Sequence, residues 1–203
     1  MDEQSSLSLH QLPPDAVAVI EALSVSPHLL AHLVLVHDVA TRLVQGIRQR
    51  WPDLSFDADA VRFGAAVHDI GKVVHPEEMT GPGSQHHAAG VALLQAHGVS
   101  AERARFARTH ATWEQEGEIG GGDIRFEDLL VALADIVWVG GRNQKLEDAV
   151  TTHLAASEGS AVWEAYMGLD DILTQLSSQS DLRLIWQTQF ATEPDADDSA
   201  PTA

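Results

Sequence analysis

Two histidines and two aspartates lie in otherwise apolar parts of this sequence. His37 has apolar residues at offsets of −4, +3 and +7, which are the neighbours that share its face on a helix. His68 and Asp69 end a second apolar segment, and Asp135 is the only charged residue between positions 129 and 140. A buried carboxylate is costly unless a cation or a metal ion pairs with it. We therefore expect a cation beside Asp135.

The donor set of two imidazoles and two carboxylates suits a metal ion that prefers nitrogen and oxygen. Mn, Fe, Zn, Ni, Co and Mg all accept such ligands, and the residues alone leave the choice among them open. The sequence contains no cysteine. This excludes a disulfide framework, a thiolate zinc site, an iron–sulfur cluster and a cysteine nucleophile.

The elements that must position these side chains are helices. The apolar period is helical almost throughout residues 13–190, and no segment alternates as a strand does. A long helix over residues 29–47 carries His37. A second helix starts at Asp57 or Asp59 and stops at Gly71 in a left-handed cap. Further helices are expected at residues 85–97, 101–110, 125–139, 144–157 and 161–178. We predict an all-α fold, a compact bundle of about six to eight helices.

His68 and Asp69 are adjacent, which restricts where they can act together. Neighbouring helical residues diverge by about 100°, so both side chains reach one point only if it lies near the end of the helix. The stop at Gly71 places the pair there.

Four short segments occur in an ordered series. They read Leu-Val-His-Asp-Val-Ala at residues 35–40, Ala-Val-His-Asp-Ile-Gly-Lys at 66–72, His-His-Ala-Ala-Gly at 86–90 and Leu-Ala-Asp at 133–135. In type and order they resemble the HD-domain (HDIG-type) metal-dependent phosphohydrolases, over residues 28–145. The resemblance implies a helical HD-type domain.

The resemblance also implies a second metal ion and cations that meet the substrate. In two-metal members, a histidine four residues before a glycine and another on the next helix complete the centre, and the paired aspartate bridges. Here these are His86, His110 and Asp69. Lys72 resembles the family lysine that contacts phosphate or assists proton transfer, and Arg142 is a further candidate for phosphate. The implied metal ligands are His37, His68, Asp69, His86, His110 and Asp135, and the implied catalytic residues are Asp69, Lys72 and Arg142.

The implied activity is hydrolysis of a small phosphate ester, such as a nucleotide, by water activated on one or two divalent metal ions. The cyclic-dinucleotide branch of the family carries a Gly-Tyr-Pro signature, whereas residues 118–123 here read Glu-Ile-Gly-Gly-Gly-Asp and Ala111 follows His110. We therefore do not expect hydrolysis of cyclic-di-GMP. Two alternatives stay open: a diiron oxygenase of the same superfamily, and a regulatory module with a structural metal and no turnover.

Composition limits the partners. The chain has 203 residues, of which 44% are hydrophobic, and it carries 12 Lys+Arg against 30 Asp+Glu, a net charge of −18. Long nucleic acids and anionic membranes would be repelled on average. No apolar run approaches the roughly 20 residues of a membrane span, and residues 1–10 do not resemble a secretory signal. We expect a cytoplasmic protein with a flexible segment at residues 1–12, one domain at 13–190 and a disordered acidic tail at 191–203. The oligomeric state stays open.

Overall fold

The protein is described here by a computed structural model that places residues 7–113 and 124–190. All regular structure in these two ranges is helical, so the predicted all-α fold is confirmed. The elements are α1 (Pro14–Ala22), α2 (Pro27–Arg50), α3 (Ala58–Val67), the 3-10 helices η1 (Ile70–Val73) and η2 (Pro76–Met79), α4 (Gln85–Ala96), α5 (Ala101–Ala104), α6 (Phe106–Thr112), α7 (Phe126–Val137), α8 (Gln144–Glu158), α9 (Val162–Ser177) and α10 (Ser180–Thr188).

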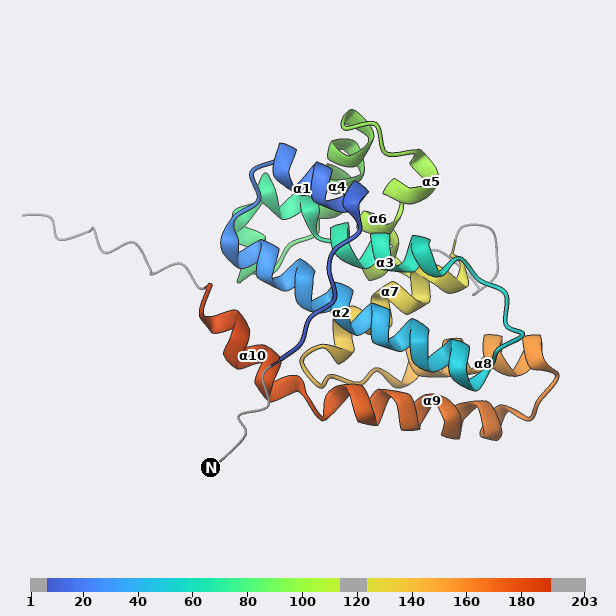
Figure 1. Cartoon of the computed structure of the whole chain (residues 1–203). Helices are drawn as coiled ribbons and strands as arrows, with labels where there is room; N and C mark the ends of the chain where they lie inside the picture. Colours follow the sequence, from blue (N-terminus) through green and yellow to red (C-terminus); the bar gives the residue numbers. More distant parts are fainter. Residues whose placement is uncertain (1–6, 114–123, 191–203) are drawn as a thin grey trace, which may run out of the picture.

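The long helix α2 lies at the centre of the fold and packs against several other helices. Ser26 caps it by accepting a hydrogen bond from the backbone N–H of Leu29, and Pro27 occupies the first turn, where its missing N–H costs nothing. In Figure 1, α2 crosses the middle of the molecule, α9 runs along one edge, and α1, α4 and α5 lie on the opposite side. Because α2 packs against α3, α7 and α9, most of its circumference is buried.

Two apolar clusters meet along α2. The larger joins α2 to α7, α8 and α9, and the smaller joins the first half of α2 to α1, α3 and α4. This double packing fixes α2, α3 and α7 relative to one another. Four of the polar residues considered below lie on α2, on α7 and directly after α3.

Gly71 does not act as the predicted left-handed cap. Helix α3 already ends at Val67, and positive φ among the described glycines occurs only at Gly98, Gly140 and Gly159. The physical reason for a glycine at position 71 is close packing, since a Cβ there would lie 1.9 Å from the carbonyl oxygen of His86.

Gly90 is the counterpart of Gly71 on α4. A Cβ at Gly90 would lie 2.9 Å from the Cβ of Ala107 and 3.3 Å from the backbone nitrogen of Gly71. The two glycines let η1 and α4 approach each other closely. As a result, the residues that follow α3 lie beside the first turn of α4.

Part of the segment expected to be flexible lies against the domain. Leu7 and Leu9 pack on the larger apolar cluster, and the backbone N–H of His10 donates to Oδ1 of Asp38 at 3.0 Å. This dark blue segment crosses over α2 in Figure 1 before it reaches α1. Residues 1–6, the residues 118–123 compared above and the tail at 191–203 lie outside the described residues. Within the described ranges, no helix combines the length and the hydrophobicity that crossing a membrane requires.

Candidate metal centre

Four side chains from three helices converge beside the end of α3. They are His32 of α2, the adjacent His68 and Asp69, and Asp135 of α7, and we call them the first ligand group. The Nε2 atom of His32 lies 3.2 Å from Nε2 of His68 and 3.2 Å from Oδ2 of Asp69. Oδ1 of Asp135 lies 3.4 Å from Nε2 of His32 and 3.3 Å from Nε2 of His68.

The other carboxylate oxygen of Asp69 contacts a second set of imidazoles. Its Oδ1 atom lies 3.2 Å from Nε2 of His86 and 3.6 Å from Nε2 of His110. The ring of His87 is 4.1 Å from that of His86 and 5.3 Å from that of His110, between ring centroids. We call Asp69 with these three histidines the second ligand group. Asp69 therefore gives one oxygen to each group, as a bridging carboxylate does.

These spacings fit a bound metal ion. Metal–ligand bonds of about 2.1 Å place neighbouring ligand atoms about 3.0–3.4 Å apart in octahedral or tetrahedral geometry. The distances from His32 to the rest of the first group, 3.2–3.4 Å, match that range. The donors are imidazole nitrogens and carboxylate oxygens, a set that suits divalent Mn, Fe, Co, Ni or Zn.

Three of the imidazoles are held with Nε2 toward the centre by bonds to their other nitrogen. The Nδ1–H groups of His68 and His110 each donate to a backbone carbonyl in the preceding turn, at 2.9 Å. Nδ1 of His86 bonds to Oε2 of the buried Glu78, which also accepts the backbone N–H of His86. Such outer bonds fix the tautomer and raise the basicity of a metal-binding imidazole.

The electrostatics of the cluster favour a cation. Burial opposes a charge on His68, yet the carboxylates of Asp69 and Asp135 outweigh it and raise the pKa of His68 to about 9. Burial and the charge on His68 together lower the pKa of His110 to about 4, which leaves it neutral and able to coordinate. The carboxylates that stabilise an imidazolium would also stabilise a divalent ion, whose binding releases the proton.

A cavity of about 420 Å³ opens onto both ligand groups. Its walls include Asp69, His86, Asp135 and Trp113. Lys72 also lines it, with Nζ 2.5 Å from Oδ2 of Asp69. The side chain of Asp135 is 28% exposed, whereas that of Asp69 is 4% exposed, so the centre is accessible from one side. A small molecule can reach the ligand atoms from this cavity.

A comparison with protein families bears directly on this arrangement. The family model "HD domain" matches residues 29–137, just over half of the chain, and the matched range contains every member of both ligand groups. The chain belongs to the HD-domain family. HD domains are generally metal-dependent phosphohydrolases, and this one has His/Asp groups able to hold a metal. Neither the search of curated proteins nor the search of solved structures finds a match.

The structure corrects the prediction for His37. In this HD domain the histidine of α2 that meets His68 and Asp69 is His32, five residues earlier. Five residues turn an α-helix by about 140° beyond a full turn, so His32 and His37 lie on different faces of α2. The imidazole of His37 is buried as its offsets predicted, but it lies near Thr41, whose Oγ1 is 3.4 Å from its Nε2.

Arg142 is also placed differently from its prediction. Its guanidinium bonds to both carboxylate oxygens of Glu147 at 2.8 Å and to Oδ1 of Asp170 at 2.6 Å. These two carboxylates neutralise Arg142 and accept from three of its five N–H donors. It therefore ties the start of α8 to α9, and Lys72 is the predicted cation that lies at the centre.

Sequence reasoning placed six residues correctly near one another and missed three. The structure brings together His68, Asp69, Lys72, His86, His110 and Asp135. It adds His32, His87 and Glu78. A sequence signal existed for His87, which is adjacent to His86, and for His32, which lies earlier on the same apolar helix. Glu78 lies in a short 3-10 turn with no periodic pattern, so nothing in the sequence indicated it.

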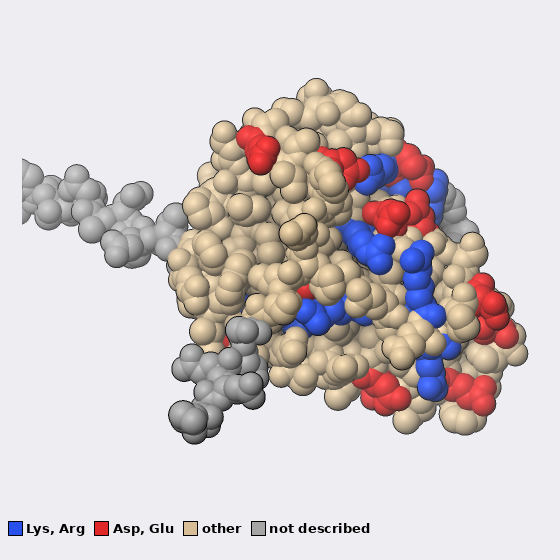
Figure 2. All heavy atoms as spheres, viewed as in Figure 1, with Lys and Arg blue, Asp and Glu red and all other residues tan. Residues whose placement is uncertain are grey.

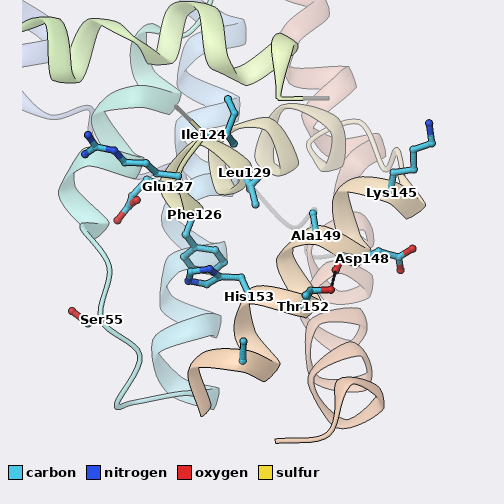
Figure 3. Close-up of a pocket in the computed structure, with 12 residues that line it drawn as sticks. Ser55, Ile124, Phe126, Glu127, Leu129, Lys145, Asp148, Ala149, Thr152 and His153 are labelled. Carbon is cyan, nitrogen blue, oxygen red and sulfur yellow. Dashed lines mark hydrogen bonds between the residues drawn. The ribbon is translucent and has the colours of Figure 1, made fainter. Parts of the chain in front are cut away.

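A separate cavity of about 870 Å³ lies between α7 and α8 and has different chemistry. Figure 3 shows the ring of Phe126 against that of His153 in its wall, and the two rings stack at 4.2 Å with an interplanar angle of 14°. Among the described residues, none of those that line it belongs to a group that could hold a metal. The candidate metal centre therefore lies beside the smaller cavity.

Proposed function

We propose that this HD domain hydrolyses a small phosphate ester, with a mononucleotide as the preferred class of substrate. One or two divalent metal ions would be held by the first and second ligand groups. The observation that carries this proposal is the position of Asp69, whose two carboxylate oxygens meet two separate sets of imidazoles beside a cavity.

When bound, the divalent ions would supply a water of lowered pKa and would polarise the phosphoryl oxygens. The chain itself would supply the geometry. His68 and His110 are fixed by backbone carbonyls, and His86 is fixed by Glu78, so the ligand atoms need little rearrangement. Lys72 would meet the negative charge of a phosphate that enters the cavity.

The cavity supports a small substrate. About 420 Å³ is within the range of pockets that enclose molecules of nucleotide size. Trp113 and Ile136 add apolar wall, and Asn143 adds an amide. The net charge of −18 opposes long nucleic acids and anionic membranes, so we propose neither as a partner. A reducing cytoplasm, which fits the absence of cysteine, remains our prediction for its location.

The test begins with protein purified without chelators. Its metal content is measured, and phosphate release is assayed on a panel of nucleotides and model esters with added Mn²⁺, Co²⁺ or Ni²⁺. We expect turnover that chelators abolish and these ions restore. Iron retention with oxygen uptake and no phosphate release would instead support a diiron oxygenase.

Two variants locate the activity. His32→Ala removes a member of the first ligand group, so we expect loss of both bound metal and turnover. His97→Ala is the matched control, because His97 ends α4 on the surface and bonds only to its own helix among the described contacts. Full activity in His32→Ala would contradict the proposed site, and a folded, metal-loaded protein without turnover on any ester would favour a regulatory module.

A further inference from the structure

His37 lines a second cleft on another face of α2. The cleft has a volume of about 780 Å³, and its walls also include Arg62 and Arg103 with their partners Asp59 and Asp15. None of its lining residues belongs to the two ligand groups or to the cavity beside them. It is therefore a separate feature from the metal centre.

The imidazole of His37 is incompletely satisfied. The residue is 2% exposed, and its Nδ1 atom has no hydrogen-bond partner. Buried polar atoms in native proteins almost always have one. Burial lowers the pKa of His37 to about 4 despite the nearby Asp38, so the ring is neutral at neutral pH. If the hydroxyl of Thr41 donates to Nε2, Nδ1 carries the proton and can donate to an oxygen of a bound molecule.

Two guanidinium groups line the same cleft. Arg62 bonds through Nη1 to Asp59 at 2.8 Å, and Arg103 bonds through Nη1 to Asp15 at 2.5 Å. The side chains of these aspartates are 91% and 50% exposed, so solvent weakens both pairs. A guanidinium has five donors, and the described contacts use one on each arginine.

The two guanidiniums can recognise an anion although their partners Asp15 and Asp59 also line the cleft. Figure 2 shows Lys and Arg side chains interspersed with Asp and Glu on the face that α2 and α3 present. Arg103 is also held in place, because its guanidinium lies 3.7 Å from the centre of the Phe63 ring. Prearranged guanidiniums recognise phosphate well, since their planar donors can bond two oxygens at once.

We propose that this cleft is a second ligand site, which binds a small phosphate monoester of mononucleotide size. Arg62 and Arg103 bind the phosphate oxygens, and His37 donates from the buried floor. Leu12 and the following prolines give an apolar wall for the rest of the molecule. The proposal does not depend on the proposed hydrolase activity, because the two sites share no residue.

The test is isothermal titration calorimetry on the full chain with EDTA present, so that no metal ion mediates binding. The probes are AMP, inorganic phosphate and adenosine. We expect AMP and phosphate to bind, and adenosine to bind at least about tenfold more weakly than AMP because it lacks the dianion. Binding of adenosine as tightly as AMP would overturn the proposal, and so would the absence of AMP binding.

Variants assign any binding to the cleft. The double variant Arg62→Gln/Arg103→Gln should weaken AMP binding by about tenfold or more. Arg48→Gln is the matched control, because Arg48 is exposed on α2 and does not line the cleft. Equal binding by the double variant and the control would overturn the proposal.

Variants at His37 and Asp59 test the site further, because two of them are expected to retain or increase the affinity for AMP. His37→Asn keeps a donor near the position of Nδ1 and should retain binding that His37→Phe loses. Asp59→Asn frees Arg62 from its only described partner, so affinity for AMP should rise. Circular dichroism and thermal melting establish that each variant is folded. Tight AMP binding by folded His37→Phe would contradict a donor role for His37.

Discussion

Asp69 is the residue on which the centre depends. Its backbone, at φ −101° and ψ 13°, lies between helical and extended conformations, in a region that active-site residues often occupy. This conformation follows the end of α3 and precedes η1. From there the two oxygens of one carboxylate meet different imidazoles, with His32 on one side and His86 on the other.

Glu78 is expected to control the second ligand group without touching a metal. Glu78→Gln removes the charge that holds Nδ1 of His86, while its amide oxygen can still accept a backbone N–H. Loss of such an outer partner typically lowers metal affinity about 10–100-fold. Titration of Mn²⁺ by calorimetry measures this, with Glu77→Gln as control because Glu77 is largely exposed. Equal affinities in the two variants would contradict the role given to Glu78.

The buried imidazole of His37 is expected to make the free energy of unfolding depend on pH in acid. The unfolded chain protonates this imidazole near its ordinary pKa of 6.5, whereas the folded protein does so only near a pKa of about 4. The unfolded state therefore binds more protons between these values, and stability falls as the pH drops through that window. The total loss is about 3 kcal/mol.

The check is urea denaturation of the chain and of His37→Asn, at about pH 7 and about pH 4.5. The variant lacks the titrating group, so its free energy of unfolding should fall by less over this range. An identical fall in both proteins would show that His37 does not supply the pH dependence.

The sequence predicted most of the clustered residues, but it did not predict which face of α2 meets His68 and Asp69. His68 and Asp69 were predictable because their adjacency restricts them to a helix end. The choice between His32 and His37 was not, because α2 packs against three helices and both histidines lie among apolar neighbours. Burial on such a helix indicates the core, and only the tertiary packing decides which buried face meets α3 and α7.

At the scale of elements, the contact between η1 and α4 joins the two halves of the centre. Helix α4 carries His86 and His87, and η1 directly follows Asp69. Gly71 and Gly90 allow this contact because neither has a Cβ. The apolar period predicted the main helices, including those of α2, α4, α7, α8 and α9. It did not predict that α3 ends at Val67 or that Gly71 packs against α4, since both depend on contacts distant in sequence.

Gly71→Ala tests this contact. Its Cβ would meet the carbonyl oxygen of His86, so α4 must shift, at a cost of about 1–3 kcal/mol in the free energy of unfolding. Metal affinity should fall as well, because the shift moves His86. Gly98→Ala is the control: its φ of +80° makes an alanine strained, but open space surrounds it. It should lower stability without lowering metal affinity, as measured by urea denaturation and Mn²⁺ titration. Unchanged metal affinity in Gly71→Ala would contradict the link.

At the scale of the molecule, charge is distributed unevenly around α2. The chain carries −18, yet one face of α2 borders a cleft that Arg62 of α3 and Arg103 of α5 also line, and another face meets a cluster of carboxylates and imidazoles. The net charge of −18 led to the prediction that long polyanions do not bind. A net charge cannot show that the two faces of α2 differ in their charged neighbours. This difference arises because α2 is long enough to serve two apolar clusters and to carry polar groups on two faces.

The most direct test of the central claim is anomalous diffraction from crystals of the full chain grown with Mn²⁺ and without chelators. We predict one peak about 2.0–2.3 Å from ligand atoms of His32, His68, Asp69 and Asp135. In a dinuclear protein, a second peak should lie between the other oxygen of Asp69 and the imidazoles of His86 and His110. A peak coordinated by His37 instead, or no peak among these ligands at saturating Mn²⁺, would contradict the account.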